Sequence, residues 1–368
     1  MRLTLRGIDY PLLLTVAALL VIGLVMVYSA SFGFGMAVDG KPTTLYLTRQ
    51  LEWAAIGAVG LLFMALIDYQ AWRRWSVPIM AAAMMILVAL LFLRGGEDQA
   101  QRWVLGNSVQ PSEIVKLAVI IYISAWLASK GEKIRQLTYG MVPFAILLGV
   151  VTGLIVLQPN FSTALLIIGT AVAMFFVAGA DILQLLVGFV AGGATLYGLV
   201  RIAPYRWARV VTFIENPLRD PFGRGYQTVR AIYALQAGGF AGVGLGASVQ
   251  KMGYLYAPHT DAIFAIIGEE LGLMGGVLII ALYAVLAYRG LRIAMRCGDA
   301  FGSLLATGVT TWLILQAALH IAVVTATVPF TGITLPFISF GGSSLVASMA
   351  AIGLLLSVSR GSRAEYAR

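Results

Sequence analysis

The chain has little cysteine, histidine or charge for its length. Of its 368 residues, one is cysteine (Cys297) and two are histidine (His259 and His320). A single cysteine excludes an intramolecular disulfide and any cysteine-based metal cluster, and two histidines exclude a histidine-rich metal site. Charged residues make up 11% of the chain and hydrophobic residues 60%. This composition is typical of a polytopic α-helical membrane protein and excludes an ordinary soluble domain.

The hydrophobic residues gather in runs long enough to cross a bilayer, which takes about 20 residues. We predict an all-α polytopic membrane protein with about ten transmembrane helices in a single domain over residues 1–368. The first run, from Tyr10 to about Tyr28, is too long for a typical signal peptide and is interpreted as an uncleaved span. The predicted spans lie near residues 10–30, 50–68, 75–94, 112–129, 141–157, 161–180, 182–200, 262–288, 303–327 and 342–358.

The net charge of +9 would suggest nucleic acid as a partner of a soluble protein, but in a membrane protein Lys and Arg at span ends set the orientation. They precede the first predicted span and follow the second, fourth, eighth and tenth. With an even number of spans, all of these ends lie on one side, which the positive-inside rule assigns to the cytoplasm. We therefore predict cytoplasmic termini and no nucleic-acid partner. The residues concerned are Arg2, Arg6, Arg73, Arg74, Lys130, Lys133, Arg135, Arg289, Arg292, Arg296, Arg360, Arg363 and Arg368.

The longest connection, about residues 201–260 between the seventh and eighth predicted spans, is basic although it lies outside the cell in this topology. Long loops escape the positive-inside bias, so its charge needs another explanation. Anionic headgroups or a pyrophosphate would supply one, and a basic amphipathic segment on anionic lipid would supply another. The polar motifs also lie on this outer face, where nucleotides are absent, so the energy must come with the substrate or from an ion gradient. The basic residues are Arg201, Arg206, Arg209, Arg219, Arg224, Arg230 and Lys251.

Asp261 is the leading candidate for chemistry. It follows His259 and Thr260, which can hydrogen-bond, and it opens the apolar run of the eighth predicted span. A helix N-terminus stabilises a carboxylate, whereas partial burial raises its pKa, and a carboxylate between these two effects suits a general base. Capping of the helix is the alternative function of an aspartate at this position.

Four further charged residues lie within or at the start of predicted spans, where charge is costly and usually functional. Glu269 lies about 80° around a helix from Asp261 and can share a face with it, whereas Glu270, at about 180°, cannot. We expect Glu270 to be paired for packing. Glu113 and Lys116 are three residues apart and can pair, or Lys116 and the helix N-terminus can face an anionic substrate.

Three other features favour structural interpretations. The segment Gly238–Gly246 is glycine-rich but lacks the strand–helix context of a nucleotide-binding loop, so it predicts close backbone packing or a turn. Small residues around Ser343 at the start of the last span permit tight helix contact. His320 lies in the middle of the ninth span and is expected to be a satisfied core histidine.

Taken together, these segments resemble the SEDS family (shape, elongation, division and sporulation proteins), which includes FtsW and RodA. The resemblance covers nearly the whole chain, and its motifs are weak singly but specific in this order on ten spans. Met26–Ser31 and Ser339–Ser344 favour the FtsW type. The family motifs are Arg102-Trp103, Gln110-Pro-Ser-Glu113 with Lys116, Gly225-Tyr-Gln227, Gly242-Val-Gly-Leu-Gly246 with Ser248 and Lys251, His259-Thr-Asp261, Gly268-Glu-Glu-Leu-Gly272 and Leu335 to Ser344.

The resemblance implies an inverting glycosyltransferase that polymerises lipid II into peptidoglycan at the outer face of the bacterial plasma membrane. The family's essential acid falls on Asp261, which would take the proton from the attacking sugar 4-hydroxyl. Arg206, Arg209 or Lys251 would stabilise the leaving pyrophosphate. A divalent cation (Mg or Mn) is allowed as a cofactor, although no ligand cluster is visible. The predicted substrate-binding residues are Arg102, Glu113, Lys116, Arg206, Arg209, Lys251, His259, Thr260, Glu269 and Ser343.

The resemblance also implies partners and exposes departures. The implied partners are lipid II, lipid-linked glycan, a class B penicillin-binding protein and other membrane proteins of division or elongation. Where the family usually has Leu-Pro-Glu, this chain has Leu255-Tyr-Ala257, and where many relatives have Gln-Pro-Asp it has Gln158-Pro-Asn160. Two alternatives stay open: a flippase or transporter of lipid-linked precursors, and a non-catalytic scaffold of the wall machinery.

Overall fold

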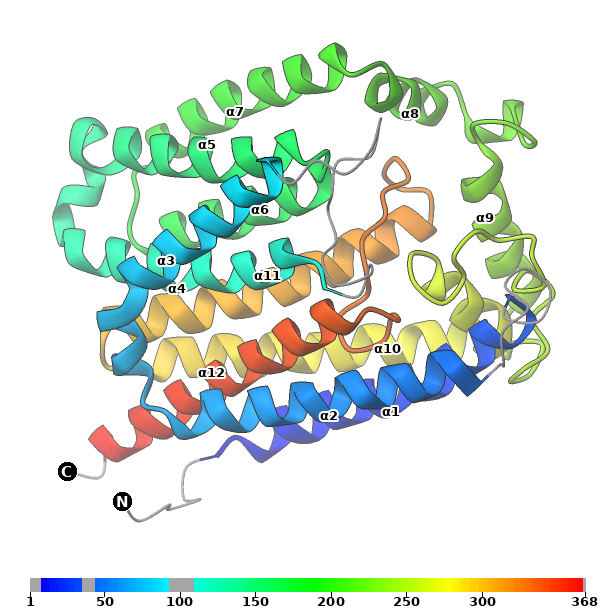
Figure 1. Cartoon of the computed structure of the whole chain (residues 1–368), viewed down its shortest axis with the longest axis horizontal. Coiled ribbons are helices and arrows are strands. Elements are labelled where there is room, and N and C mark those ends of the chain that lie inside the picture. Colours follow the sequence, from blue (N-terminus) through cyan, green and yellow to red (C-terminus); the bar gives the residue numbers. More distant parts are fainter. Residues whose placement is uncertain (1–7, 35–43, 93–108, 367–368) are drawn as a thin grey trace.

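The computed structural model describes residues 8–34, 44–92 and 109–366. Its long apolar helices run side by side in one bundle (Figure 1). Two shorter helices, α8 (Pro204–Ile214) and α9 (Tyr226–Gly238), lie in the long connection before α10. The apolar helices are α1 (Tyr10–Phe34), α2 (Thr44–Leu66), α3 (Tyr69–Phe92), α4 (Pro111–Lys130), α5 (Val142–Leu157), α6 (Phe161–Val177), α7 (Ile182–Ile202), α10 (Ile263–Arg296), α11 (Ala300–Val324) and α12 (Gly342–Tyr366).

These helices coincide with the predicted spans, and the polytopic all-α fold is confirmed. In the described part of the chain, nine helices are long and apolar enough to cross a membrane, and α6 is a shorter apolar helix. Some predicted boundaries are wrong. Helix α3 begins at Tyr69, so Arg73 and Arg74 lie within it, and α10 continues to Arg296. Arginine side chains reach the headgroup region from inside the last turns of a span, so basic residues do not mark the end of a helix.

Helix α12 lies in the centre of the bundle, and α7 lies at its margin. Most of α12 is buried, and it packs along α2 (Figure 1). Gly353 of α12 lies against the backbone of Leu61, and Gly57 of α2 lies against Met349. Small residues let helix backbones approach closely in a membrane, where packing replaces the hydrophobic effect. In contrast, α7 buries only Gln184 and lies at the edge of the bundle.

The ends that carry the basic residues lie together at one end of the bundle. Arg289 near the end of α10 pairs with Asp9 at the start of α1, with 2.5 Å between Nη2 and Oδ2. The Tyr69 hydroxyl donates to Asp299, just before α11, at 2.5 Å, and Arg360 of α12 donates to the Leu66 carbonyl at 3.0 Å. The structure thus confirms that these ends share one side of the bundle.

Helix α10 is broken, which the sequence did not predict. Gly272 has φ 66° and ψ −163°, so the segment 263–271 is separated from the rest of the helix. Residues 263–270 are all buried, whereas Leu273 and Met274, directly after the break, are exposed. The part after Gly272 is about 36 Å long at 1.5 Å per residue and can cross a bilayer alone. The segment before it, here named the half-helix 263–271, is enclosed by protein.

The glycine-rich segment after α9 closes the end of the half-helix. The amides of Val243 and Gly244 donate to the carbonyls of Glu269 and Glu270, each at 3.0 Å, and so satisfy groups that the break leaves without helical partners. A Cβ atom at Gly242 would collide with the Glu270 carbonyl oxygen. The interpretation of the glycines as close backbone packing is therefore confirmed.

Candidate functional site

Asp261 lies in a turn directly before the half-helix 263–271. Its amide donates to the Ala257 carbonyl at 3.2 Å. The carbonyls on the two preceding residues are held from the segment before α12: the Ser339 hydroxyl donates to Thr260 at 2.7 Å, and the Phe340 amide donates to His259 at 2.8 Å. The turn that carries Asp261 is therefore held by hydrogen bonds between segments far apart in the sequence.

Helix capping is not the function of Asp261. The N-cap position of α10 is Ala262, and no side chain caps that helix end. The Asp261 carboxylate instead lies against Gly332, where a Cβ atom would be 2.8 Å from Oδ2. The backbone of Gly332 therefore approaches the carboxylate closely, and a larger residue there would displace the Asp261 side chain.

The environment of Asp261 opposes its ionisation. Burial raises the pKa of Asp261 from 3.8 to about 6, while the charge of Arg209 pulls it down. Removal from water disfavours the charged form of a carboxyl group, and a nearby cation favours it. At neutral pH, Asp261 is ionised but retains a higher affinity for a proton than an ordinary aspartate.

The two arginines of α8 have different surroundings. Arg209 is the one that acts on Asp261, and its Nη1 donates to the Phe330 carbonyl at 3.4 Å. The Arg206 guanidinium lies over the Phe161 ring at 5.2 Å and donates to the Leu199 carbonyl at 3.3 Å. The structure therefore brings Arg209 to the candidate site and uses Arg206 to dock α8 onto α6 and α7.

Glu270 and Lys251 form a buried cluster deeper in the protein. The Lys251 ammonium lies 2.6 Å from Glu270 Oε1, and the Ser29 hydroxyl of α1 lies 2.7 Å from both Glu270 oxygens. Lys251 is 0% exposed. The expected pairing of Glu270 is confirmed, and Lys251 is placed with Glu270 and Ser29 instead of with Asp261.

Glu269 is also held by the loop that precedes Asp261. Its carboxylate accepts hydrogen bonds from the Ser248 hydroxyl at 2.5 Å and the Val249 amide at 2.9 Å. These contacts turn it toward the loop, and the structure does not bring it to Asp261. We name the set Ser29, Ser248, Lys251, Glu269 and Glu270 the half-helix cluster, because it fixes the far end of the half-helix.

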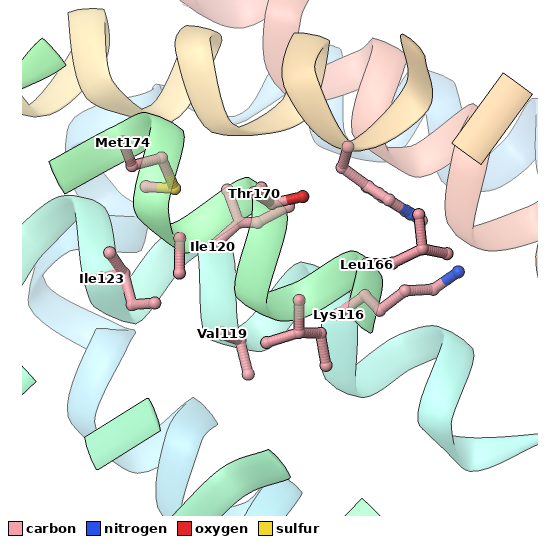
Figure 2. A pocket seen from close by; sticks show the side chains of 10 residues that line it. Lys116, Val119, Ile120, Ile123, Leu166, Thr170 and Met174 are labelled. Atoms are coloured by element: carbon pink, nitrogen blue, oxygen red, sulfur yellow. The ribbon is translucent and has the colours of Figure 1, made fainter. Parts of the chain in front are cut away.

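Lys116 is the centre of a second buried set of polar groups. It pairs with Glu113 at 2.8 Å, donates to Gln316 of α11 at 2.9 Å and lies 4.8 Å from the Trp312 ring centroid. The expected pairing of Glu113 with Lys116 is confirmed. Lys116 also lies at one end of a small, mainly apolar cavity between α4, α6 and α11, with Ile123 and Met174 at the other (Figure 2).

Four more of the predicted substrate-binding residues remain, and the structure describes three of them. The His259 ring packs 4.6 Å from the Tyr46 ring, and the Thr260 hydroxyl donates to the Ala257 carbonyl at 3.2 Å. Ser343 accepts a hydrogen bond from the Gln110 amide at 2.8 Å, which joins the starts of α12 and α4. Arg102 lies outside the described residues.

The departures from the family pattern have structural explanations. Asn160 accepts from the Thr163 amide at 3.4 Å as the N-cap of α6 and donates to Ser112 at 3.1 Å, so its neutral amide serves both contacts. Ala257, where the family usually has Glu, lies in the turn that receives the amide of Asp261. The predicted core role of His320 is confirmed, because its Nδ1 lies 2.6 Å from the Ile333 carbonyl oxygen.

Sequence reasoning missed Ser29, Gln316, Gly332 and Thr334. A glutamine within an apolar span is a signal that was available for Gln316, whereas serine, glycine and threonine are ordinary in membrane helices and loops. Among residues 8–34, 44–92 and 109–366, no group of three or more His, Cys, Asp and Glu side chains is arranged to hold a metal ion. Mg²⁺ is usually held by one or two carboxylates together with substrate phosphates, and Asp261 can supply one of these.

These features define a polytopic helical membrane protein with a partly buried carboxylate beside an arginine at one end of its bundle. The chain belongs to the family of cell cycle proteins that comprises FtsW, RodA and SpoVE, whose model matches residues 10–364. It is 42% identical over 364 residues to stage V sporulation protein E of Bacillus subtilis, covering 96% of this chain and 98% of that protein.

Further similarities extend to a named enzyme and to solved structures. A probable peptidoglycan glycosyltransferase FtsW of Trichlorobacter lovleyi is 41% identical over 358 residues, with 96% of this chain and 93% of that protein covered. A chain in a structure described as the coordination of polymerization and crosslinking by a peptidoglycan synthase complex matches with a TM-score of 0.81 and 26% identity, over 97% of this chain and 99% of that one. Thermus thermophilus RodA matches with a TM-score of 0.71 and 26% identity, over 97% and 98%.

Proposed function

We propose that this protein is a peptidoglycan glycosyltransferase that polymerises lipid II, with Asp261 as the general base. Membership of the family and similarity to proteins named as glycosyltransferases support the reaction class. The observation that carries the assignment to Asp261 is its environment: a partly buried carboxylate, with a pKa raised to about 6, beside Arg209. A base with a pKa near the working pH combines ionisation with an adequate affinity for the proton.

The proposed reaction uses Asp261 and Arg209. The 4-hydroxyl of the acceptor sugar attacks the anomeric carbon of the lipid-linked donor, and Asp261 takes the hydroxyl proton. The new glycosidic bond forms as the bond between the anomeric carbon and the pyrophosphate oxygen breaks, so the anomeric configuration inverts and lipid pyrophosphate leaves with the electron pair. Arg209 stabilises the negative charge that develops on the leaving group. A divalent cation, held by the pyrophosphate and a carboxylate, would add to this stabilisation.

The proposed setting is the outer face of the bacterial plasma membrane. There the lipid-linked donor carries its own activation, which suits a face without nucleotides. The similarity to a chain of a polymerisation and crosslinking complex supports a class B penicillin-binding protein as partner, alongside other membrane proteins of division or elongation. The FtsW and SpoVE relatives support the division or sporulation type over the elongation type.

The test is polymerisation of lipid II by the purified protein with its partner. We expect glycan strands from the wild type, and a loss of about a thousandfold or more with Asp261→Asn, since a general base and its charge are removed together. Below a pH of about 6, the wild-type rate should fall tenfold per pH unit. Arg209→Gln should move this limb to higher pH, because Arg209 lowers the pKa of Asp261.

The matched control is Glu215→Gln, which removes an exposed carboxylate at the end of α8 and should leave the rate unchanged. Full activity of folded Asp261→Asn would refute Asp261 as the base. Translocation of lipid II across liposomes without any polymer would refute the glycosyltransferase and favour a flippase. Each reaction is run with and without Mg²⁺ or Mn²⁺, which tests the cation separately.

A further inference from the structure

We propose that Gln316 of α11 is a positioning residue, which holds the segment 329–336 so that Gly332 closes over the carboxylate of Asp261. This inference rests on the proposed function, because the effect it predicts is on catalysis. It concerns a side chain that lies in a different helix from Asp261 and acts through the segment between α11 and α12.

The hydrogen bonds of Gln316 fix the orientation of its amide. Its Oε1 lies 2.9 Å from Lys116 Nζ and 2.9 Å from Trp312 Nε1. An ammonium and an indole N–H are donors only, so the atom between them must be the amide oxygen. The Gln316 amide therefore cannot be flipped, and its NH₂ group must point the other way.

That NH₂ group is fully used on one residue of the segment 329–336. Gln316 Nε2 lies 2.9 Å from the Thr334 carbonyl oxygen and 3.1 Å from Thr334 Oγ1. Since Thr334 Oγ1 accepts from Gln316, its own proton is free to be donated to Ser344 Oγ, 2.9 Å away. Gln316 thus has all of its hydrogen-bonding capacity satisfied, and Thr334 is tied to both α11 and α12.

The neighbouring residue is held by the next turn of the same helix. His320 lies four residues after Gln316 and so faces the same direction. Its Nδ1 is 2.6 Å from the Ile333 carbonyl oxygen, and because a carbonyl only accepts, Nδ1 carries the proton. Gln316 and His320 together hold Thr334 and Ile333, and the next residue toward α11 is Gly332.

Gly332 connects this anchor to the chemistry. A Cβ atom at Gly332 would lie 2.8 Å from Asp261 Oδ2, so its backbone covers the carboxylate. Arg209 of α8 is the charged group that acts on Asp261 and is itself bonded to Phe330 of the same segment. The ring of His259 packs on Tyr46 instead. A shift of the segment would therefore change both the water around Asp261 and the place of Arg209.

Gln316→Glu tests this with little change of shape. A carboxylate still accepts from Lys116 and Trp312, but it has no proton for Thr334 and repels the Thr334 carbonyl. The control is Thr310→Val in the same helix, because Thr310 is also buried and, among the residues that the structure describes, its hydroxyl donates only to the Ala306 carbonyl one turn away. Thr334→Val and Thr334→Ser form a second pair that leaves the Lys116 contacts intact.

The measurement is the pH dependence of lipid II polymerisation, with kcat and KM determined separately. We expect Gln316→Glu to lower kcat about 10- to 100-fold with little change in KM, the size of effect that a misplacement of about 1 Å produces. Its acid limb should move from a pH of about 6 toward lower pH, because water that reaches Asp261 relieves its burial, the largest cause of the raised pKa, and this outweighs a weaker contact with Arg209. Thr334→Val should lower kcat and move the acid limb in the same direction as Gln316→Glu. Thr334→Ser and Thr310→Val should have the kcat and the pH profile of the wild type.

An unmoved acid limb in both Gln316→Glu and Thr334→Val would overturn the proposal, whether or not activity falls, because a purely structural loss lowers the amount of active enzyme without changing its pH profile. An equal loss of kcat in Thr334→Val and Thr334→Ser would also overturn the proposal. Failure of the proposed function is distinguished by the wild type and Asp261→Asn: without polymer from the first, or with polymer from the second, Asp261 is not the base.

Discussion

Two carboxylate regions on one short segment are held in opposite ways. At the far end of the half-helix 263–271, Glu270 is enclosed and neutralised by Lys251 at 2.6 Å. At the near end, Asp261 is partly buried, and in the described part of the chain no basic side chain forms an ion pair with it. Burial therefore raises its pKa, although the charge of Arg209 limits the rise.

The difference separates architecture from chemistry. A buried carboxylate is tolerated in the protein where a cation compensates its charge, as Lys251 does for Glu270. A carboxylate that is desolvated without a close ion pair is destabilised in its charged form and binds a proton more readily. The half-helix cluster thus gives a rigid support, and the Asp261 turn carries the reactive group.

The largest expected effect comes from breaking the neutralised region. Lys251→Met leaves Glu270 buried without its cation, which should lower the free energy of unfolding by about 3–5 kcal/mol. Combining it with Glu270→Leu should recover most of the loss, because the uncompensated charge is then gone. Thermal and denaturant unfolding in detergent measure both. Lys133→Met, at an exposed lysine, is the control. An equally unstable double variant would contradict an electrostatic origin.

A smaller effect is expected at the backbone contact of the same region. Gly242 and Gly246 both have φ +82°, but a Cβ atom meets the Glu270 carbonyl only at Gly242, whereas at Gly246 nothing lies within 4 Å. Alanine at either position carries the left-handed strain of about 1–2 kcal/mol. Gly242→Ala should cost about 1–3 kcal/mol more because it also overpacks. Equal unfolding free energies for the two variants would show that the close approach is unimportant.

The parts of the fold that depend on local sequence were predictable. Spans follow from the length of apolar runs, and the Glu113–Lys116 pair follows from helical spacing. The break at Gly272 was not predictable, because this glycine lies in a continuous apolar pattern. Distant backbone groups make the break tolerable: the amides of Val243 and Gly244 and the carbonyls of Gly239 and Phe240 bond to the groups that it frees. Such contacts leave no periodic signal in the sequence.

The candidate site shows the same limit. Asp261 was identified by its motif, but the basic residues of the long connection could not be ranked, since isolated arginines in a loop look alike in sequence. The position of α8 separates Arg209 from Arg206. Ser29 lies 241 residues from Glu270, a contact that no spacing rule could supply.

The remaining expected effect concerns stability at the reactive end, and its sign is opposite to that of Lys251→Met. The pKa of Asp261 is about 6 when folded and 3.8 for an ordinary aspartate, so the folded state binds this proton more tightly. Its contribution to stability is fully present below a pH of about 4 and is lost as the pH rises through about 6. Asp261→Asn, which is always neutral, should therefore be more stable than the wild type at pH 7.

Unfolding measured from pH 4 to pH 8 tests this directly. The advantage of Asp261→Asn should grow from near zero at the acid end and reach a plateau above a pH of about 6. Glu215→Gln, at an exposed carboxylate, should show no such curve. If Asp261→Asn is inactive but more stable than the wild type, the charged Asp261 carboxylate lowers the stability of the protein and is kept for its reactivity. If Asp261→Asn is instead destabilised at pH 7, then Asp261 belongs with Glu270 as a structural carboxylate, and the contrast between the two regions fails.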